Sequence, residues 1–255
     1  MSDSKLCVIT KDQLRKYKEL YVIGDLHGDI DTFQRIMNIL KPKNLPFIPP
    51  DKFVIFLGDY GDKGPYGYEI IHFMNHLVDY PNVVALMGNH DDRPGDLIEQ
   101  VKGKGINWEE YLEKTFDPFR NRLYMGALIK DESLLVHGFV YRGMTLDDFM
   151  RPKKEDREKT REKILWSDPT DDTHEEVPNY ERGLGVKAGE NVTREICGLF
   201  RVRRIIRSHG SDGFRFYHGT RVLSINSSGM DATDPCILYI SPKNPSYFKP
   251  IPLYP

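Results

Sequence analysis

Short apolar runs recur along the chain, and each is followed by a turn rich in polar or ionisable residues. Five segments share this form: "LYVIGDLHG" (20–28), "FVIFLGDYGDKG" (53–64), "NVVALMGNHDD" (82–92), "SLLVHGF" (133–139) and "RIIRSHGSDG" (204–213). Continuous apolar runs with many β-branched residues are typical of strands buried on both faces. The pattern therefore predicts five buried strands, each ending in a polar turn.

Two segments between these runs show a helical period instead. In "IDTFQRIMNIL" (30–40) and in "YEIIHFMNHLV" (68–78), the apolar residues fall on one helical face. Alternation of strand and helix predicts an α/β domain built in layers, and ligand sites of such sheets gather at the carboxyl ends of the strands. We expect a single domain over 1–255, with a short N-terminal lead, a solvated charged helix at 153–163 and a proline-rich tail (242–255) lying extended on the surface.

The composition of the chain indicates its cellular compartment and the kinds of partner it binds. The formal charge of −2 gives no support for a nucleic-acid or membrane-surface partner. The three cysteines form no CxxC pair, which argues against a disulfide framework and favours a reducing compartment. The N-terminus lacks the apolar core of a signal peptide, and no run approaches the ~20 apolar residues of a membrane span. We expect a cytoplasmic protein that binds neither nucleic acid nor membrane.

The polar turns carry residue types that bind metal ions. The candidate ligands, taken along the chain, are Asp25, His27, Asp59, Asn89, His137 and His209. Oxygen and imidazole ligands without thiolate suit manganese, iron or zinc. Six ligands exceed what one four-coordinate ion with a bound water needs, so they predict two ions that share a bridging carboxylate. Each turn alone has an ordinary structural explanation, and it is their co-occurrence that predicts the site.

These motifs resemble those of the metallophosphoesterases. "GDLHG", "GDYGDKG" and "GNHD", followed by "VHG" and "RSHG", are similar to the GDxHG, GDxVDRG and GNHE motifs of the phosphoprotein phosphatase family, which acts on phosphoserine and phosphothreonine. The segment "WSDP" and the Arg-Gly that follows it also match, and the resemblance covers about residues 20–225. It implies a layered sandwich of two mixed β-sheets flanked by helices. It also implies a phosphorylated protein as substrate, with regulatory subunits as further partners.

The resemblance implies a role for each residue. Asp25, His27 and Asp59 would hold the first metal, and Asp59 would bridge to a second metal bound also by Asn89, His137 and His209. The two ions are most simply manganese, with iron or zinc as alternatives. His90 would protonate the leaving alkoxide and Asp62 would orient His90. Lys63 and Arg182 would hold the phosphate during direct attack of a metal-bound hydroxide. All of these residues lie within the segments that resemble the family.

The chain departs from the family pattern at several positions. Lys63 replaces an arginine, Asp91 replaces the glutamate of GNHE, and Gly61 replaces a valine. The segment "VLSINSSGMDAT" lacks a tyrosine that the family often carries beside the active site. Three other functions stay open: a dinucleoside polyphosphate hydrolase, some of which carry GNHD; a metallonuclease or phosphodiesterase; and a catalytically inactive binder of phosphorylated partners.

The remaining histidines have simpler explanations. His72 and His76 lie one helical turn apart without the glutamate of an HExxH motif, so we interpret them as an ordinary pair. We expect His174 and His218 to be solvated, and Trp166 to pack in the core.

Overall fold

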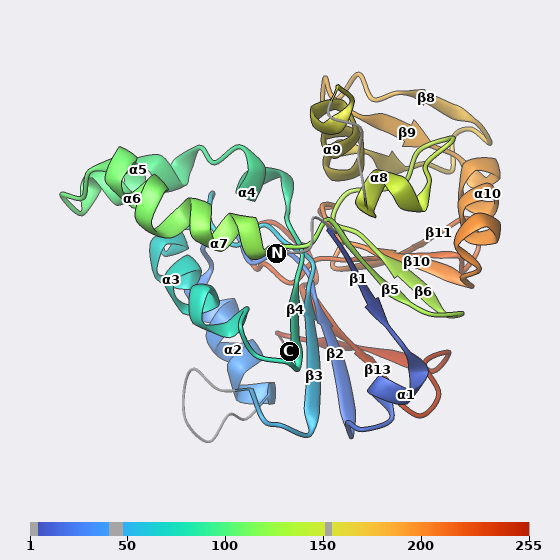
Figure 1. Ribbon diagram of the computed structural model, residues 1–255, viewed down its shortest axis with the longest axis horizontal. Helices are drawn as coiled ribbons and strands as arrows, with labels where there is room; N and C mark the ends of the chain where they lie inside the picture. The colour runs from blue at the N-terminus through green and yellow to red at the C-terminus, as the bar shows by residue number, and fades with distance from the viewer. Residues whose placement is uncertain (1–4, 41–47, 151–154, 255) are drawn as a thin grey trace.

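The computed structural model describes residues 5–40, 48–150 and 155–254. Two mixed β-sheets pack face to face at the centre, and helices cover their outer faces (Figure 1). This arrangement confirms the layered α/β sandwich expected from the sequence. A third, three-stranded sheet was not anticipated.

The first sheet carries the strands of the three N-terminal motifs. Its strand order is β14-β13-β2-β3-β4. The strands are β2 (Glu19–Ile23), β3 (Lys52–Phe56), β4 (Val83–Ala85), β13 (Cys236–Ile240) and β14 (Phe248–Pro252). Strands β2, β3 and β4 are parallel, with Tyr21 opposite Val54, whereas β13 runs antiparallel to β2. The carboxyl ends of the three parallel strands therefore meet at one edge of the sheet.

The second sheet carries the strands that precede the two late histidines. Its strand order is β1-β5-β6-β10-β12-β11. The strands are β1 (Leu6–Ile9), β5 (Gly126–Ile129), β6 (Ser133–Leu135), β10 (Arg204–Arg207), β11 (Phe214–Tyr217) and β12 (Val222–Ile225). Strand β10 lies parallel to both β6 and β12, so the turns after β6 and β10 leave the sheet side by side.

The helices fall into three groups. Helices α2 (Ile30–Leu40) and α3 (Gly67–Leu77) confirm the two predicted helices and lie beside the first sheet. A chain of short helices extends away from this side: α4 (Asn89–Asp92), α5 (Asp96–Gly103), α6 (Trp108–Tyr111), the π-helix η1 (Leu112–Phe116) and α7 (Asp117–Arg122). The short helix α1 (Lys11–Leu14) follows β1.

The third group of helices lies with the small sheet above the six-stranded sheet (Figure 1). It comprises α8 (Leu146–Met150), α9 (Arg157–Trp166) and α10 (Glu190–Phe200), together with β7 (Asp168–Pro169), β8 (Glu176–Pro178) and β9 (Val186–Ala188). Helix α9 corresponds to the charged helix predicted at 153–163, of which the first two residues lie outside the described part of the chain.

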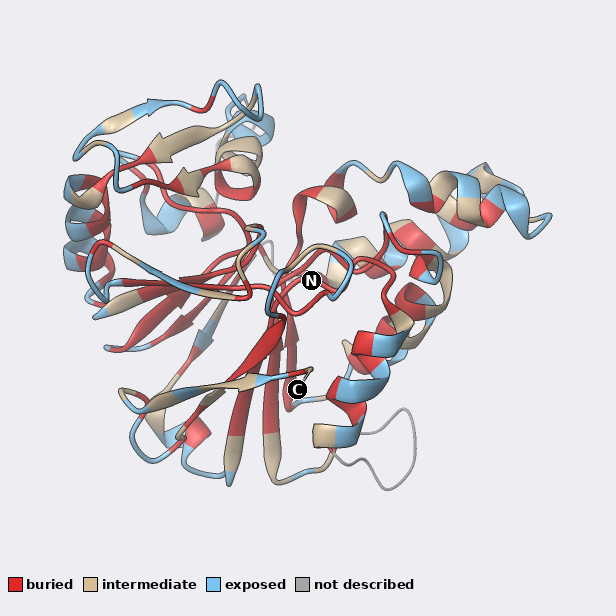
Figure 2. Ribbon diagram, turned by 180° about the vertical axis from the view of Figure 1, so that it is seen from behind, coloured by how far each residue is buried: buried red, intermediate tan, exposed pale blue. Residues whose placement is uncertain are grey.

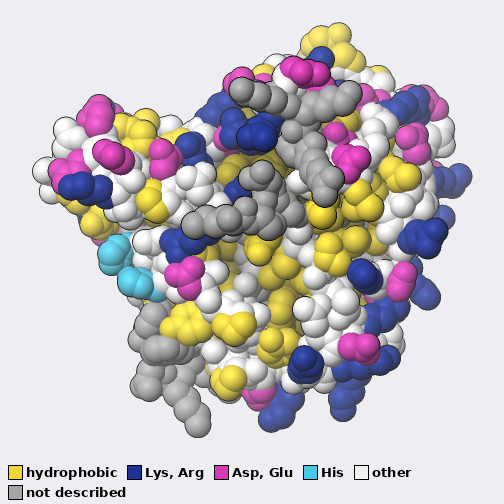
Figure 3. Space-filling model, in the orientation of Figure 1, with side chains coloured by type: hydrophobic (Ala, Val, Ile, Leu, Met, Phe, Trp, Pro, Cys, Tyr) yellow, Lys and Arg dark blue, Asp and Glu magenta, His cyan; other side chains and the backbone are white. Residues whose placement is uncertain are grey.

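The core follows from the alternation of side chains along the strands. Leu20 and Val22 point between the two sheets, while Tyr21 and Ile23 point toward the helices. Apolar residues on both faces explain why the sequence shows continuous hydrophobic runs. Figure 2 shows the central strands largely buried, whereas the helices are buried on one side and exposed on the other. On the face in Figure 3, hydrophobic side chains lie near the centre and many Lys and Arg lie along the right-hand edge.

One expectation from the sequence was wrong, and another was incomplete. The proline-rich tail does not merely lie on the surface, because Phe248–Pro252 forms edge strand β14 against β13. Proline is tolerated on an edge strand, where its missing N–H costs no ladder bond. His218 is buried rather than solvated, and its ring contacts the hydroxyl of Thr193 and the carbonyl of Thr170.

The cysteines and the lengths of the helices also bear on the sequence predictions. All three cysteines are free thiols. No helix among the described residues has both the length and the apolar character needed to cross a bilayer.

Candidate metal centre and active site

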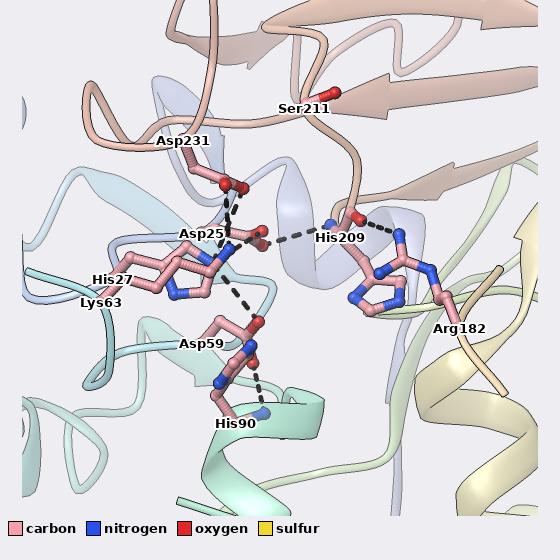
Figure 4. A pocket seen from close by; sticks show the side chains of 9 residues that line it. All are labelled: Asp25, His27, Asp59, Lys63, His90, Arg182, His209, Ser211 and Asp231. Atoms are coloured by element: carbon pink, nitrogen blue, oxygen red, sulfur yellow. Dashed lines mark hydrogen bonds and ion pairs between the residues drawn. The ribbon is translucent and has the colours of Figure 1, made fainter. Parts of the chain in front are cut away.

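The five polar turns converge at the edge where the two sheets meet. Asp25 and His27 follow β2, Asp59 follows β3, Asn89 begins α4 after β4, His137 follows β6, and His209 follows β10. They surround an open cavity of about 180 Å³. Nine residues line this cavity: Asp25, His27, Asp59, Lys63, His90, Arg182, His209, Ser211 and Asp231 (Figure 4). All ten predicted site residues thus lie in or directly behind one cavity.

The backbone of these turns adopts a conformation that non-glycine residues rarely take. His27, Asp59, Asp62, Lys63 and His209 all have positive φ, between 24° and 68°. Left-handed backbone costs of order 1 kcal/mol or more for such residues and is concentrated at functional sites. The fold therefore holds five of the predicted residues in strained turns, and all of these except Asp62 line the cavity.

One group of possible ligands lies around His27. Its Nε2 atom is 3.5 Å from Asp25 Oδ2 and 3.6 Å from Asp59 Oδ2. The imidazole is fully buried, and neither of its nitrogens forms a hydrogen bond with the part of the chain that the structure describes. Leaving a buried polar group without a partner is costly, so an imidazole in this state indicates a cation site.

A second group lies on the other side of Asp59. His137 Nε2 is 3.3 Å from Asp59 Oδ2 and 2.9 Å from Asn89 Oδ1. His209 stands beside His137, with ring centroids 5.0 Å apart, and its Nε2 is buried without a hydrogen bond to any described residue. Asp59, His137 and His209 offer three ligand atoms within 4.8 Å of one another, while Asp59 also groups with His27 and His90. Asp59 therefore lies between two ligand sets.

The electrostatics of the cavity favour cations. Burial alone would raise the pKa of Asp59, but the neighbouring His137, His27 and His90 outweigh it and hold this pKa well below its ordinary value. Burial, reinforced by His137 and Arg182, holds the pKa of His209 well below its ordinary value. An ionised carboxylate beside a neutral imidazole is the donor set that a divalent metal ion requires.

His90 forms a pair with Asp62 at the rim of the cavity. Its Nδ1 lies 2.8 Å from Asp62 Oδ2, and its ring meets His27 edge to face. Asp62 is held in turn by the backbone N–H groups of Gly95 and Leu97, which donate to its two oxygens. Burial would lower the pKa of His90, but the hydrogen bond to Asp62 and the charge of Asp59 raise it to about 9. A pKa in this range favours the protonated imidazole at neutral pH.

Two cationic side chains reach the same cavity. Lys63 Nζ lies 2.9 Å from Asp231 Oδ1. The Arg182 guanidinium donates to Asp168 at 2.5 Å and to the carbonyl oxygen of His209 at 2.9 Å. Asp168 also binds the fully buried Arg207, which fixes the position of its carboxylate. Each cation is therefore already held by an acidic neighbour at the edge of the cavity.

Asp91, a departure from the family pattern, braces the turn behind the cavity. It is buried, and its two oxygens accept from the backbone N–H groups of Asp59, Tyr60 and Gly88. Burial and the nearby charge of Asp59 raise the pKa of Asp91 to about 7. The side chain shapes the backbone that carries Asp59 and does not line the cavity.

Two residues that line the cavity, Ser211 and Asp231, were not predicted from the sequence. Asp231 lies in the loop between β12 and β13, the segment noted above for its missing tyrosine. No motif marked it, because a lone aspartate in a polar loop is common. Only the packing of this loop against the turns after β2 and β3 brings its carboxylate to the cavity.

Comparison with known proteins gives a consistent picture. A family model described as calcineurin-like phosphoesterase matches residues 19–210. Serine/threonine-protein phosphatase 6 catalytic subunit of Caenorhabditis elegans is 30% identical over 222 residues, which cover 81% of this chain and 63% of that protein. Serine/threonine-protein phosphatase C23G10.1 of the same organism is 28% identical, over 88% of this chain and 50% of that protein. The chain thus spans about half to two thirds of these two relatives.

A solved structure extends the likeness to the fold. It is a serine/threonine phosphatase of Saccharomyces cerevisiae described as similar to human phosphatase PP5. The TM-score is 0.73 at 20% identity, over 94% of this chain and 77% of that one. At this identity the likeness shows a shared fold.

Proposed function

Because the chain belongs to the calcineurin-like phosphoesterase family, we propose that it is a metal-dependent phosphomonoesterase that hydrolyses phosphoserine and phosphothreonine in proteins. The observation that carries this proposal is the convergence of five strand-end turns on one cavity, with acids, imidazoles and two cations around it. The named relatives are serine/threonine protein phosphatases, which supports this class of substrate.

The residues present fit two metal ions. Asp25, His27 and Asp59 would hold the first ion, and Asp59 would be shared with the second, which would also take Asn89, His137 and His209. The orphaned nitrogens of His27 and His209 and the central position of Asp59 support this division. When bound, such a pair of ions polarises the phosphoryl group and makes water nucleophilic at neutral pH.

We assign proton transfer to His90. Its Nδ1 is occupied by Asp62, which leaves Nε2 as the atom that donates a proton to the departing serine or threonine oxygen. The hydrogen bond to Asp62 raises the pKa of His90 and so favours the protonated imidazole. Asp62, held by two backbone N–H groups, fixes the orientation of the ring and does not itself touch the substrate.

Lys63 and Arg182 would bind the phosphoryl oxygens from two sides of the cavity. Their charges offset the negative charge that builds on these oxygens during transfer. Arg182 is anchored by Asp168 and by the backbone, so it presents a fixed guanidinium. Lys63 is a point charge without the planar fork of the family's arginine, and we expect it to orient the phosphate less strictly.

The dinucleoside polyphosphate hydrolase remains the second candidate within the family. The residue that favoured it was Asp91, which completes GNHD in place of GNHE. The Asp91 carboxylate accepts hydrogen bonds from three backbone N–H groups behind the cavity, so it does not face a substrate and cannot distinguish a nucleotide from a phosphopeptide. The GNHD motif therefore does not favour a dinucleoside polyphosphate hydrolase over a protein phosphatase.

We further propose manganese as the resident metal, the cytoplasm as the location, and regulatory subunits as partners besides the phosphorylated substrate. Oxygen and nitrogen ligands without thiolate support the metal assignment. Three free thiols support a reducing compartment. The near-neutral charge supports the absence of a nucleic-acid partner.

A panel of substrates tests the proposal. The Mn²⁺-loaded protein is offered phosphoserine and phosphothreonine peptides, a phosphotyrosine peptide and diadenosine tetraphosphate, and phosphate release or nucleotide cleavage is measured as kcat/KM. We expect the phosphoserine and phosphothreonine peptides to be preferred. A higher kcat/KM for the dinucleotide would replace the proposal with the second candidate, and no turnover of any substrate would favour a non-catalytic binder.

A further inference from the structure

Asp231 contacts both the candidate metal centre and the phosphate-binding lysine. Its Oδ1 atom lies 2.9 Å from Lys63 Nζ. Its Oδ2 atom accepts a hydrogen bond of 3.1 Å from Asn226 Nδ2 and lies 3.8 Å from His27 Nε2. Figure 4 shows the carboxylate pointing from its loop toward His27 and Lys63. The two oxygens of one side chain therefore face two different partners.

The position of Asp231 around His27 matches that of the expected ligands. Three carboxylate oxygens surround His27 Nε2, at 3.5 Å for Asp25, 3.6 Å for Asp59 and 3.8 Å for Asp231. Ligand atoms bound about 2.0–2.2 Å from one ion lie roughly 3–4 Å apart. Asp231 is thus spaced from the imidazole almost as Asp25 and Asp59 are, although it comes from a loop far along the chain.

The unpartnered imidazole gives a second, independent indication. His27 is fully buried, and Nε2 donates to and accepts from no atom of the described chain. That nitrogen faces the gap between the three carboxylates, and Asp25, His27 and Asp231 offer ligand atoms within 4.8 Å of one another. A cation in this gap would pair with all four groups.

We propose that Asp231 is a fourth protein ligand of the first metal ion and that its second oxygen holds Lys63 beside that ion. The inference rests on the proposed function for the presence of the ion, and it adds a ligand that none of the sequence motifs contains. It also explains how a lysine serves in place of an arginine: the carboxylate supplies the positional restraint that a flexible ammonium lacks.

The proposal predicts that replacing Asp231 weakens the binding of one metal ion. Losing a residue that merely supports a ligand weakens metal binding by about 10- to 100-fold, so losing a ligand should cost no less than about tenfold. Asp231→Asn keeps the size of the side chain and a carbonyl oxygen but removes the charge. We expect the affinity for one of two Mn²⁺ ions to fall at least tenfold while the other is unchanged.

The experiment titrates metal-free protein with Mn²⁺ and counts free Mn²⁺ by electron paramagnetic resonance, without substrate. Asp234→Asn is the matched control, because it removes the same charge from an exposed position three residues away in the same loop. Lys63→Met, alone and combined with Asp231→Asn, separates metal binding from charge neutralisation. The loss caused by Asp231→Asn should persist in the Lys63→Met background, and Asp234→Asn should bind both ions as the parent does.

Unchanged affinity in Asp231→Asn would overturn the proposal. A loss that disappears when Lys63 is removed would overturn it too, since Asp231 would then act only as a counter-ion. If Asp231→Asn binds one ion at least tenfold more weakly but the parent hydrolyses no phosphoester, the proposed function fails and the assignment of Asp231 as a ligand stands. If Asp231→Asn binds both ions as tightly as the parent does and the parent hydrolyses phosphopeptides, the ligand role of Asp231 fails and the proposed function stands.

Discussion

Replacing Gly88 with alanine would place a methyl group against Asp59. Gly88 precedes α4 and has φ −98° and ψ 174°, an extended conformation that alanine adopts without strain. An added Cβ would nonetheless lie 2.0 Å from Asp59 Oδ1 and 2.5 Å from Asp59 N. The conflict is therefore purely steric, and it falls on the residue that lies between the two ligand sets.

The size of the displacement follows from these distances. Ordinary van der Waals contact begins at 3.4 Å, so Asp59 Oδ1 would have to move away by roughly 1.4 Å. The added Cβ would also lie too close to the backbone N of Asp59, so a side-chain rotation alone would not relieve the clash. That movement would break the hydrogen bond from His90 N to Asp59 Oδ1. Overpacking of this kind costs about 1–3 kcal/mol of folding free energy. Metal–ligand distances tolerate only about 0.2 Å, so both ions should bind at least about tenfold more weakly.

Urea unfolding and metal analysis after dialysis would test this prediction together. The matched control is Gly103→Ala at the end of α5, where an added Cβ meets nothing within 4 Å. The control should keep its metal and lose no stability, with a gain of up to about 1 kcal/mol. If Gly88→Ala bound both ions as tightly as the parent and unfolded at the same urea concentration, the placement of Asp59 against Gly88 would be wrong.

Three further predictions concern the surroundings of the cavity. Asp62→Asn should lower kcat and move the alkaline limb of the pH–rate profile to lower pH, because Asp62 raises the pKa of His90 and the protonated ring is the active form; an unmoved limb would exclude His90 as the titrating acid. Removing metal with a chelator should abolish phosphate release and lower the Tm in calorimetry, since buried carboxylates would lose their counter-ions, and Mn²⁺ should restore both; an unchanged Tm would argue against resident ions. Asp168→Ala should cost about 3–5 kcal/mol in urea unfolding because it strands the buried Arg207, with Asp168→Asn milder; a loss below about 1 kcal/mol would contradict the pairing.

Sequence patterns were sufficient to predict most of the residues that gather around the cavity, because these residues follow strands directly. Asp25 and Asp59 stand two and three residues after β2 and β3, and the parallel pairing of these strands brings them to the same edge. His137 and His209 likewise follow β6 and β10, which are neighbours in the second sheet. In these turns the local sequence and the sheet topology determine position together.

Features that depend on distant packing were not predictable in the same way. Asp231 reaches the cavity only because the loop between β12 and β13 folds over the turn that carries Lys63. The proline content of the tail concealed strand β14, which pairs antiparallel with β13 at the edge of the first sheet. The third sheet is built from strands of two or three residues, too short for a recognisable period.

The two-metal site is tested by a paired measurement on Asp59→Asn. Metal content per chain and phosphate release from a phosphothreonine peptide would be determined on the same samples as for the parent protein. A carboxylate between two ligand sets predicts that the parent holds two ions, and that the variant loses affinity for both and has no measurable turnover. Turnover at the parent's rate with matched metal content would contradict the shared role of Asp59 and the two-metal site built on it.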